Sequence, residues 1–222
     1  MGELPIGEAV DVTPAGRPTR RTRTGRFVTL SPVDPNLHAG PLFEATRDAP
    51  DVWTYLGYGP FDDEAAMRTW LGSLVPQEDP LFLTVTDRAS DSPVGVVAFM
   101  NVDSAMRHLE LGNIWYAPAA QRTRVNTDTV HLMLGEAFDE LGHRRVEWKC
   151  DALNARSRSA AERLGFTFEG VFRQHMVVKG RNRDTAWFSM LDREWPRIRA
   201  NMQRWLDADP VAASLRELNT RV

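Results

Sequence analysis

The chain has 222 residues, which is enough for one α/β domain with extensions and for a sizeable buried core. Its formal net charge of −3 and sequence pI near 6.0 exclude the clustered basic surface of a general nucleic-acid or membrane binder, so we expect neither partner. The single cysteine, Cys150, excludes a disulfide within the chain, and its apolar surroundings predict a buried thiol.

The N-terminal residues 1–25 are predicted to form an extended arm. They hold three prolines and few large apolar side chains, and we expect the arginines at 17, 20, 21 and 23 to be solvated. There is no apolar core of signal-peptide length and no stretch near the 18 apolar residues of a membrane span, which favours a cytoplasmic protein.

Globular structure is predicted to begin with a strand over residues 26–30 and a helix that ends near residue 47. The segment 51–61 then gathers four aromatic residues, and Asp62 or Asp63 caps a helix through Leu74. We expect Trp53 and Phe61 to pack this part onto the sheet. Tyr55 and Tyr58 keep a polar tip and are therefore the better candidates for a ligand pocket.

Three strands follow, over residues 81–86, 94–102 and 108–116, and their short connections predict an antiparallel meander. Apolar residues on both faces of the middle strands indicate helices on both sides of the sheet. A helical stripe runs from Val130 to Leu141, with Asn126 or Thr127 as the expected N-cap and Gly142 as the residue after the helix.

The strand 145–151 comes after that helix and should therefore lie parallel to the strand 108–116. A short helix ends at Gly165, a hairpin joins 166–178 to 183–191, and a last helix covers about 194–207. We expect an arm at 1–25, one domain at 26–193, and a C-terminal helix and tail at 194–222.

Two polar junctions stand where the neighbouring parallel strands end. The first is the loop 121–126, which leads into a helix and so offers free backbone N–H groups to an anion such as phosphate. The second contains Asn154 and Ser157. Both should open at the same edge of the sheet, where a ligand with a phosphate at one end and amides along its length would fit.

The order of elements and several motifs resemble the GNAT superfamily of N-acyltransferases, in the branch that includes the ribosomal-protein N-terminal acetyltransferases RimJ and RimL. The resemblance covers roughly residues 25–195. The motifs that carry it are the segments 110–115 and 121–127, Asn154-Ala155-Arg156-Ser157, and Leu164-Gly165-Phe166 followed by Glu169-Gly170.

This resemblance implies a GNAT fold of mixed α/β (α+β) type. We expect a central, mostly antiparallel mixed sheet of about seven strands, helices on both faces, and a parallel pair at the acyl-CoA cleft. It also implies acetyl-CoA as the acyl donor, with the pantetheine arm along the strand 111–116 and the pyrophosphate on the loop. The residues expected to bind it are Ile114, Trp115, Tyr116, Gln121, Arg122, Thr123, Arg124, Val125, Asn126, Thr127, Asn154, Arg156 and Ser157.

The first junction departs from the family pattern, which is Gln/Arg-x-x-Gly-x-Gly/Ala. Gln121 fits, but Arg124 and Asn126 occupy the two glycine positions. Glycine there lets the backbone approach phosphate and take unusual dihedral angles. Arg122 and Arg124 could instead pair with the phosphates through charge-assisted hydrogen bonds. The alternative is that both arginines point to solvent and that CoA binding is weakened.

Acyl transfer to an amine requires a base for the ammonium, a donor for the carbonyl oxygen and an acid for the leaving thiolate. Glu110 is the candidate base, acting through water, and the alternative is an exposed strand residue. A backbone N–H near Ile114 or Trp115 is the candidate donor if the strands separate there. Ser157 matches the hydroxyl that family members place near the CoA sulfur, which makes it the candidate acid; the alternative is a residue of the first helical turn.

The amine acceptor is expected near Tyr55, Tyr58, Asp103 and His175. His175 is also a possible base, because the reference pKa of histidine is close to neutral. The five histidines have no metal-ligand spacing, so we expect no metal.

The sequence leaves several alternatives open. The acceptor is either a protein N-terminal amine or a small-molecule amine, including an antibiotic, and the acyl group is acetyl or another such as succinyl. A non-catalytic CoA-binding or partner-binding module is the competing class, because of the altered glycine positions. The chain is expected to be a monomer or a homodimer.

Overall fold

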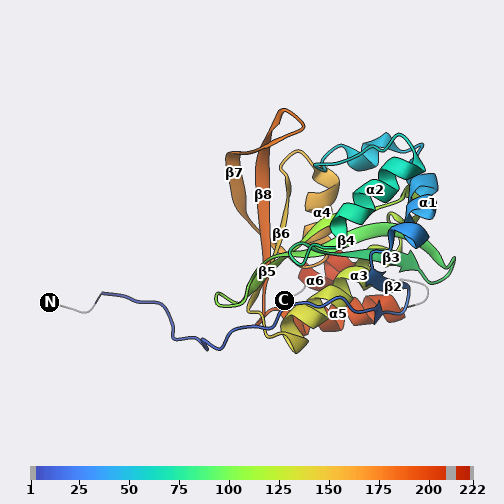
Figure 1. Cartoon of the computed structure of the whole chain (residues 1–222). Helices are drawn as coiled ribbons and strands as arrows, with labels where there is room; N and C mark the ends of the chain where they lie inside the picture. The colour runs from blue at the N-terminus through green and yellow to red at the C-terminus, as the bar shows by residue number, and fades with distance from the viewer. Residues whose placement is uncertain (1–3, 209–213, 221–222) are drawn as a thin grey trace.

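The computed structural model describes residues 4–208 and 214–220, which form one sheet covered by helices (Figure 1). The sheet has eight strands in the order β1-β2-β3-β4-β5-β6-β8-β7. The strands are β1 (Arg23–Thr24), β2 (Val28–Pro32), β3 (Leu81–Asp87), β4 (Ser92–Asp103), β5 (His108–Tyr116), β6 (Arg145–Asp151), β7 (Thr167–Val178) and β8 (Arg181–Leu191). Neighbouring strands are antiparallel except β5 and β6, which are parallel.

The predicted mixed sheet is therefore confirmed, with eight strands in place of about seven. The difference includes β1, a two-residue strand in which Arg23 pairs with Leu30. It lies inside the segment expected to be an extended arm. So short a pairing has no periodicity of its own from which it could be predicted.

Helices cover both faces of the sheet, as expected from the apolar character of its middle strands (Figure 1). The helices are α1 (Pro35–Thr46), α2 (Glu64–Leu74), α3 (Arg124–Gly135), α4 (Ala155–Arg163), α5 (Trp195–Asp207) and α6 (Leu215–Thr220), with short turns η1 (Pro50–Trp53), η2 (Pro118–Ala120) and η3 (Glu136–Glu140). Within the described ranges, no helix is long and apolar enough to cross a membrane.

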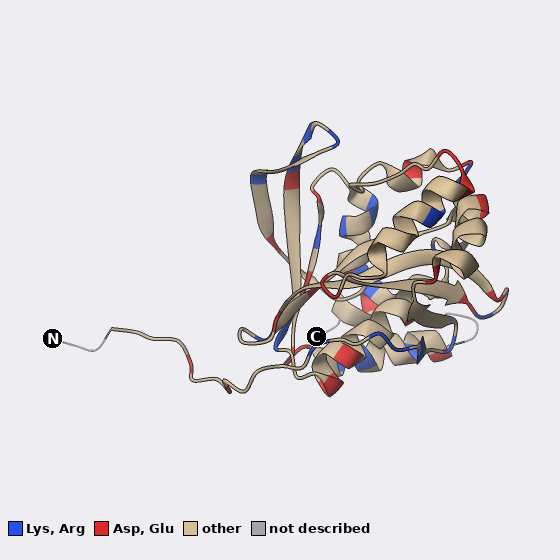
Figure 2. Cartoon of the chain, viewed as in Figure 1, with Lys and Arg blue, Asp and Glu red and all other residues tan. Residues whose placement is uncertain are grey.

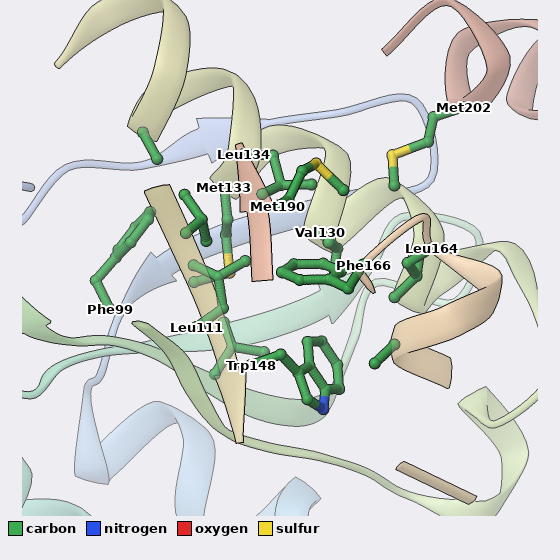
Figure 3. Packing of buried hydrophobic residues seen from close by; sticks show 14 of the residues in the cluster. Phe99, Leu111, Val130, Met133, Leu134, Trp148, Leu164, Phe166, Met190 and Met202 are labelled. Atoms are coloured by element: carbon green, nitrogen blue, oxygen red, sulfur yellow. The ribbon is translucent and has the colours of Figure 1, made fainter. Parts of the chain in front are cut away.

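Two apolar cores lie on the two sides of the sheet. The smaller one joins α1 and α2 to β3 and β4, and Trp53 stacks there at 4.7 Å from Trp115 and 5.2 Å from Phe61. The larger one joins α3 and α5 to the opposite face, where Trp148 and Phe166 meet (Figure 3). The predicted packing role of Trp53 and Phe61 is confirmed. Cys150 is buried beside the larger core, as expected for an apolar thiol.

The arginines of the N-terminal segment do not all remain in solvent. Arg23 is 6% exposed, and its guanidinium donates to both carboxylate oxygens of Glu136, at 2.6 Å for the Nη2 to Oε1 contact. Glu136 is itself buried at the start of η3. The expectation of solvated arginines is wrong for Arg23, because a carboxylate 113 residues away neutralises its charge inside the fold.

Glu136→Gln should lower the free energy of unfolding by about 3 to 5 kcal/mol, because the buried guanidinium of Arg23 then loses its counter-charge. Urea unfolding followed by tryptophan fluorescence measures this loss. The control is Glu140→Gln, which removes the exposed partner of Arg21 and should cost less than about 1 kcal/mol. Equal losses for the two variants would contradict the anchoring role of the buried pair.

Candidate functional site

The parallel strands β5 and β6 pair over a short distance and then separate. Their register pairs His108, Leu109 and Glu110 with residues 145–147 of β6. Further along, β6 stays paired with β8 and β5 stays paired with β4. Near Asn113, whose φ is +52°, β5 uses three residues where its partner β4 uses two, which forms a β-bulge. This bulge turns β5 away from β6 and leaves the β5 edge beyond Glu110 open.

A cavity of about 680 Å³ lies between the separated strands β5 and β6 and extends to the aromatic loop 52–58. Its walls come from β4, β5, β6, α4 and the β7–β8 hairpin. The predicted site residues that line it are Tyr55, Tyr58, Glu110, Ile114, Asn154, Ser157 and His175. Residues of β5 and of the second polar junction, Asn154 and Ser157, therefore meet in one cavity.

Glu110 lies at the point where the two strands part and is 5% exposed, so the alternative of an exposed strand residue is wrong. Its Oε2 accepts hydrogen bonds from Asn101 Nδ2 at 2.6 Å and Lys149 Nζ at 3.0 Å. Burial raises the pKa of the Glu110 carboxyl, while the contacts with Lys149 and Asn101 oppose the rise. This carboxyl can therefore exchange a proton closer to neutral pH than an exposed glutamate can.

Lys149 was not among the predicted site residues. Its ammonium contacts Glu110 and also Glu147 Oε2, at 2.9 Å, and lies 3.9 Å from the centre of the Trp187 ring. Burial would raise the pKa of Glu147, but Lys149 and Arg145 hold it below its ordinary value. Lys149 thus faces one carboxylate that is firmly ionised and one, Glu110, whose pKa is raised.

A second irregularity of β4 directs Asn101 toward Glu110. Asn101 has φ of +51°, and Asp79 accepts from its N–H at 2.8 Å and from the N–H of Val102 at 2.9 Å. Arg17, from the N-terminal segment, contacts the same Asp79 carboxylate at 3.3 Å. This support could not be predicted from local sequence, because Asp79 lies 62 positions after Arg17 and 22 positions before Asn101.

Asn154 and Ser157 form the beginning of α4. The Asn154 Oδ1 atom accepts from the Ser157 N–H at 3.0 Å and so caps the helix. The Ser157 Oγ atom accepts from Trp148 Nε1 at 2.9 Å. Because the Ser157 oxygen is the acceptor in this hydrogen bond, the hydroxyl proton is not used by Trp148. It can therefore be donated into the cavity. Its position in the first helical turn is thus compatible with the predicted acid role.

The remaining acceptor candidates take different positions. Tyr55 donates from its hydroxyl to Leu153 O at 3.2 Å, and His175 Nδ1 lies 3.0 Å from Thr185 Oγ1. Burial raises the pKa of Tyr58, which keeps its hydroxyl protonated. Asp103 does not line the cavity; it accepts from Met106 N in the turn between β4 and β5.

Several residues expected to bind the donor do not line the cavity. Trp115 and Tyr116 are buried in the two cores, and Tyr116 donates from its hydroxyl to Asn126 Oδ1 at 3.1 Å. Arg156 pairs with Asp51 at 2.8 Å on the surface. The loop 121–127, which follows the carboxyl end of β5, does not line the cavity either. The cavity therefore contains the reacting end of the predicted site and leaves the anion loop apart from it.

The anion loop begins its helix earlier than predicted. Thr123, not Asn126 or Thr127, is the N-cap of α3, and its Oγ1 accepts from the Val125 N–H at 3.2 Å. Arg124 is thus the first helical residue. Gln121 closes the loop by donating from its side chain to Tyr116 O at 2.9 Å.

The two glycine positions do not need glycine's conformational freedom. Arg124 and Asn126 are ordinary helical residues of α3, and the left-handed residue of this loop is Arg122, with φ of +61°. Arg124 also points elsewhere than expected. It donates to Leu206 O and Ala208 O at the end of α5 and lies 5.0 Å from the Phe27 ring centre. The alternative of an Arg124 side chain that points to solvent is wrong, because α5 offers it unpaired carbonyls, whereas its contact with phosphate stays a prediction.

Comparison with known proteins identifies the family. Residues 28–167 match the acetyltransferase (GNAT) domain. The chain belongs to the GNAT acetyltransferase family. A GCN5-related N-acetyltransferase of Brucella melitensis is 42% identical in its crystal structure, with a TM-score of 0.90 over 93% of this chain and 97% of that one. A GNAT-family structure from Chromobacterium violaceum is 41% identical, with a TM-score of 0.79 over 87% of this chain and 100% of that one.

A curated relative indicates the branch within the GNAT family. YdaF of Bacillus subtilis (strain 168), which carries the provisional name of ribosomal N-acetyltransferase, is 33% identical over 101 residues. This match covers 46% of the chain and 55% of YdaF, so the chain spans about half the length of this relative. The resemblance to the GNAT superfamily is confirmed, and with it the assignment as an N-acyltransferase, and the match to YdaF supports the RimJ and RimL branch.

Arg124→Ala should lower the free energy of unfolding by about 1 to 2 kcal/mol, because α5 loses the cation at its C-terminal carbonyls. It should change the dissociation constant of acetyl-CoA by less than about threefold. Thermal unfolding and titration calorimetry measure the two effects. The matched control, Arg122→Ala, removes the exposed arginine of the same loop and should weaken acetyl-CoA binding without loss of stability. A tenfold weaker affinity for the Arg124 variant alone would contradict this division.

Proposed function

We propose that the chain transfers an acetyl group from acetyl-CoA to a primary amine, by direct transfer while both substrates are bound. The observation that carries the proposal is the buried Glu110 carboxyl at the fork of β5 and β6, beside an open strand edge and the Ser157 hydroxyl. A protein N-terminal amine is the acceptor class that the relationship to YdaF supports, and a small-molecule amine is the alternative.

The donor fits the residues present at the fork. The open edge of β5 beyond Glu110 offers backbone groups to the amides of the pantetheine arm. Asn154 uses its Oδ1 atom on the helix and keeps its side-chain NH₂ for the same arm. The N-terminus of α3, with Arg122 beside it, provides backbone N–H groups and charge for phosphate. Acetyl-CoA supplies an acetyl group activated as a thioester.

Each residue of the fork then has a distinct duty. Glu110 accepts the proton that the ammonium must lose before its nitrogen attacks. A backbone N–H at Ile114 or Trp115 stabilises the carbonyl oxygen as negative charge develops on it. Ser157, held by Trp148, provides a proton at the position of the leaving sulfur. The N–C bond forms as the C–S bond breaks. Of the two protons that the ammonium nitrogen loses, one goes to Glu110 and the other replaces the proton that Ser157 gives to the leaving sulfur.

Glu110→Gln should reduce turnover by about 100-fold or more while acetyl-CoA binding persists, because the variant keeps the shape of the side chain and loses the base. Titration calorimetry with acetyl-CoA comes first, and absence of binding at millimolar concentration would overturn the proposal. A thiol-release assay over amines and peptides with free N-termini then identifies the acceptor. Replacing acetyl-CoA with succinyl-CoA in the same assay tests the acyl group. Unchanged turnover in the variant would remove Glu110 as the base.

Lys149→Met should move the acidic limb of the pH–rate profile to higher pH. The ammonium of Lys149 stabilises the ionised form of Glu110, so its loss raises the pKa of that carboxyl further. Lys149→Arg keeps a cation and should retain most of the original profile. The chain's other lysine gives the matched control: Lys179→Met removes a cation that contacts carbonyls of the aromatic loop and should leave the limb in place. An unmoved limb in Lys149→Met would contradict the coupling.

A further inference from the structure

The N-terminal arm, defined here as residues 4–12, runs away from the domain that it belongs to (Figure 1). All nine residues are exposed. The arm is held at its base, where Ala15 N–H donates to Ser104 O at 2.9 Å and Asp11 pairs with Arg107 at 3.1 Å. A fixed base with an exposed, extended continuation is an arrangement suited to reaching another molecule.

The arm has the side-chain pattern of a strand that lacks a partner. Its even-numbered positions are Leu4, Ile6, Glu8, Val10 and Val12, four of them large and apolar, whereas the odd-numbered positions between them are proline, small residues and aspartate. In an extended chain the even positions share one face. Ile6 is 93% exposed and Val12 is 81% exposed. An apolar face of this kind in water is typical of a contact surface.

The complementary feature is β7. It is the last strand of the sheet, so one of its edges has no neighbouring strand among the described residues. It exposes an unusual number of large apolar side chains for a strand, namely Phe168, Val171, Phe172, Met176 and Val177. An open edge with exposed apolar side chains is where an extended segment adds to a sheet.

The charges of the arm and of the β7–β8 hairpin are also opposite in sign. The arm contains Glu8 and Asp11 and no cation, whereas residues 171–183 of the hairpin contain Arg173, Lys179, Arg181 and Arg183 and no acidic residue. Figure 2 shows the blue cluster at the hairpin and the red positions on the arm. A bulge at 173–175 interrupts the β7 edge, because Phe172 pairs with Thr185 and Met176 with Arg183. A second irregularity lies between Phe168 and Gly170, so regular pairing over three residues is confined to the short stretches 170–172 and 176–178, each as long as the shortest strands.

We propose that two copies of this chain form a two-fold dimer in which the arm of each copy docks along β7 of the other. A two-fold exchange suits this chain because every copy carries one arm and one β7 edge, so both contacts close without leaving a free surface. The arm covers the apolar side chains of β7, and its Glu8 faces the cationic hairpin, while Asp11 stays with Arg107 at the arm's base. Since the hairpin also lines the cavity through His175, Met176 and Arg183, the dimer contact adjoins the candidate site.

Deletion of residues 2–10 tests the proposal, since it removes the apolar arm and keeps the Asp11 contact with Arg107. Light scattering after gel filtration should give twice the 25.1 kDa of one chain for the full chain and a single-chain mass for the deletion variant. Ile6→Asp with Val10→Asp, and separately Val177→Asp, should each raise the dimer dissociation constant at least tenfold. The matched control is Leu37→Asp, which charges an exposed apolar residue of α1 and should leave the dimer intact. A full chain that is monomeric at about 100 μM, or a deletion variant that remains dimeric, would overturn the proposal.

A cross-linking experiment decides between exchange and a contact within one chain. In a Cys150→Ser background, one tagged chain carries Val10→Cys and an untagged chain carries Val171→Cys. Oxidation of the mixture should join tagged to untagged chains, and the thermal unfolding of each variant verifies that it is folded. If the disulfide forms within a single chain carrying both cysteines and no cross-link joins the two kinds of chain, the arm folds back on its own β7 and the exchange is excluded.

Discussion

The separation of β5 from β6 is the constraint on which the rest of the site depends. Three residue pairs hold the parallel strands together, and the bulge at Asn113 then directs β5 away while β6 remains with β8. Had the pairing continued, the backbone groups of β5 would be satisfied by β6 and no ligand could reach them. The fork creates both the cavity and the open edge. Glu110 is the last residue of β5 that pairs with β6, so its carboxyl lies at the cavity.

Placing a carboxylate at such a fork is costly unless charge and hydrogen bonds surround it. Lys149 and Asn101 both contact one oxygen of Glu110, and Asp79 holds the β4 irregularity that directs Asn101. Arg17 connects this support to the N-terminal segment. Residues from the loop before β3, from β4, β5 and β6, and from the segment before β1 therefore set the electrostatics of one side chain. Burial of Glu110 and its nearby cation act in opposite directions on its pKa, and this balance adapts the carboxyl for proton exchange.

The N-terminal segment has two parts with different physical characters. From Ala15 to Thr24 it is bound to the domain through backbone hydrogen bonds, the buried Arg23 and Glu136 pair, and the contact of Arg17 with Asp79. From Leu4 to Val12 it exposes apolar side chains along one face. Its charges are complementary to those of the hairpin that flanks the cavity. In the proposed dimer, the surface that receives the arm would therefore adjoin the candidate site on the same sheet.

The sequence by itself determined the elements, most of their order in the sheet and one of the two polar junctions. Alternation and helical stripes predicted the strands 108–116 and 145–151 and their parallel relation. Asn154 and Ser157 were predicted as a polar strand-to-helix junction, and in the structure Asn154 caps the helix there. The expectation that the two glycine positions of the anion loop need unusual dihedral angles was wrong. A motif does not say which residue takes the left-handed conformation, and here that residue is Arg122. Only the tertiary structure decided that Arg124 caps α5, that Arg23 is buried against Glu136 and that Lys149 contacts Glu110. These partners lie far apart along the chain, and long side chains can reach several alternatives, so their pairing follows from the packing of whole elements and not from local sequence.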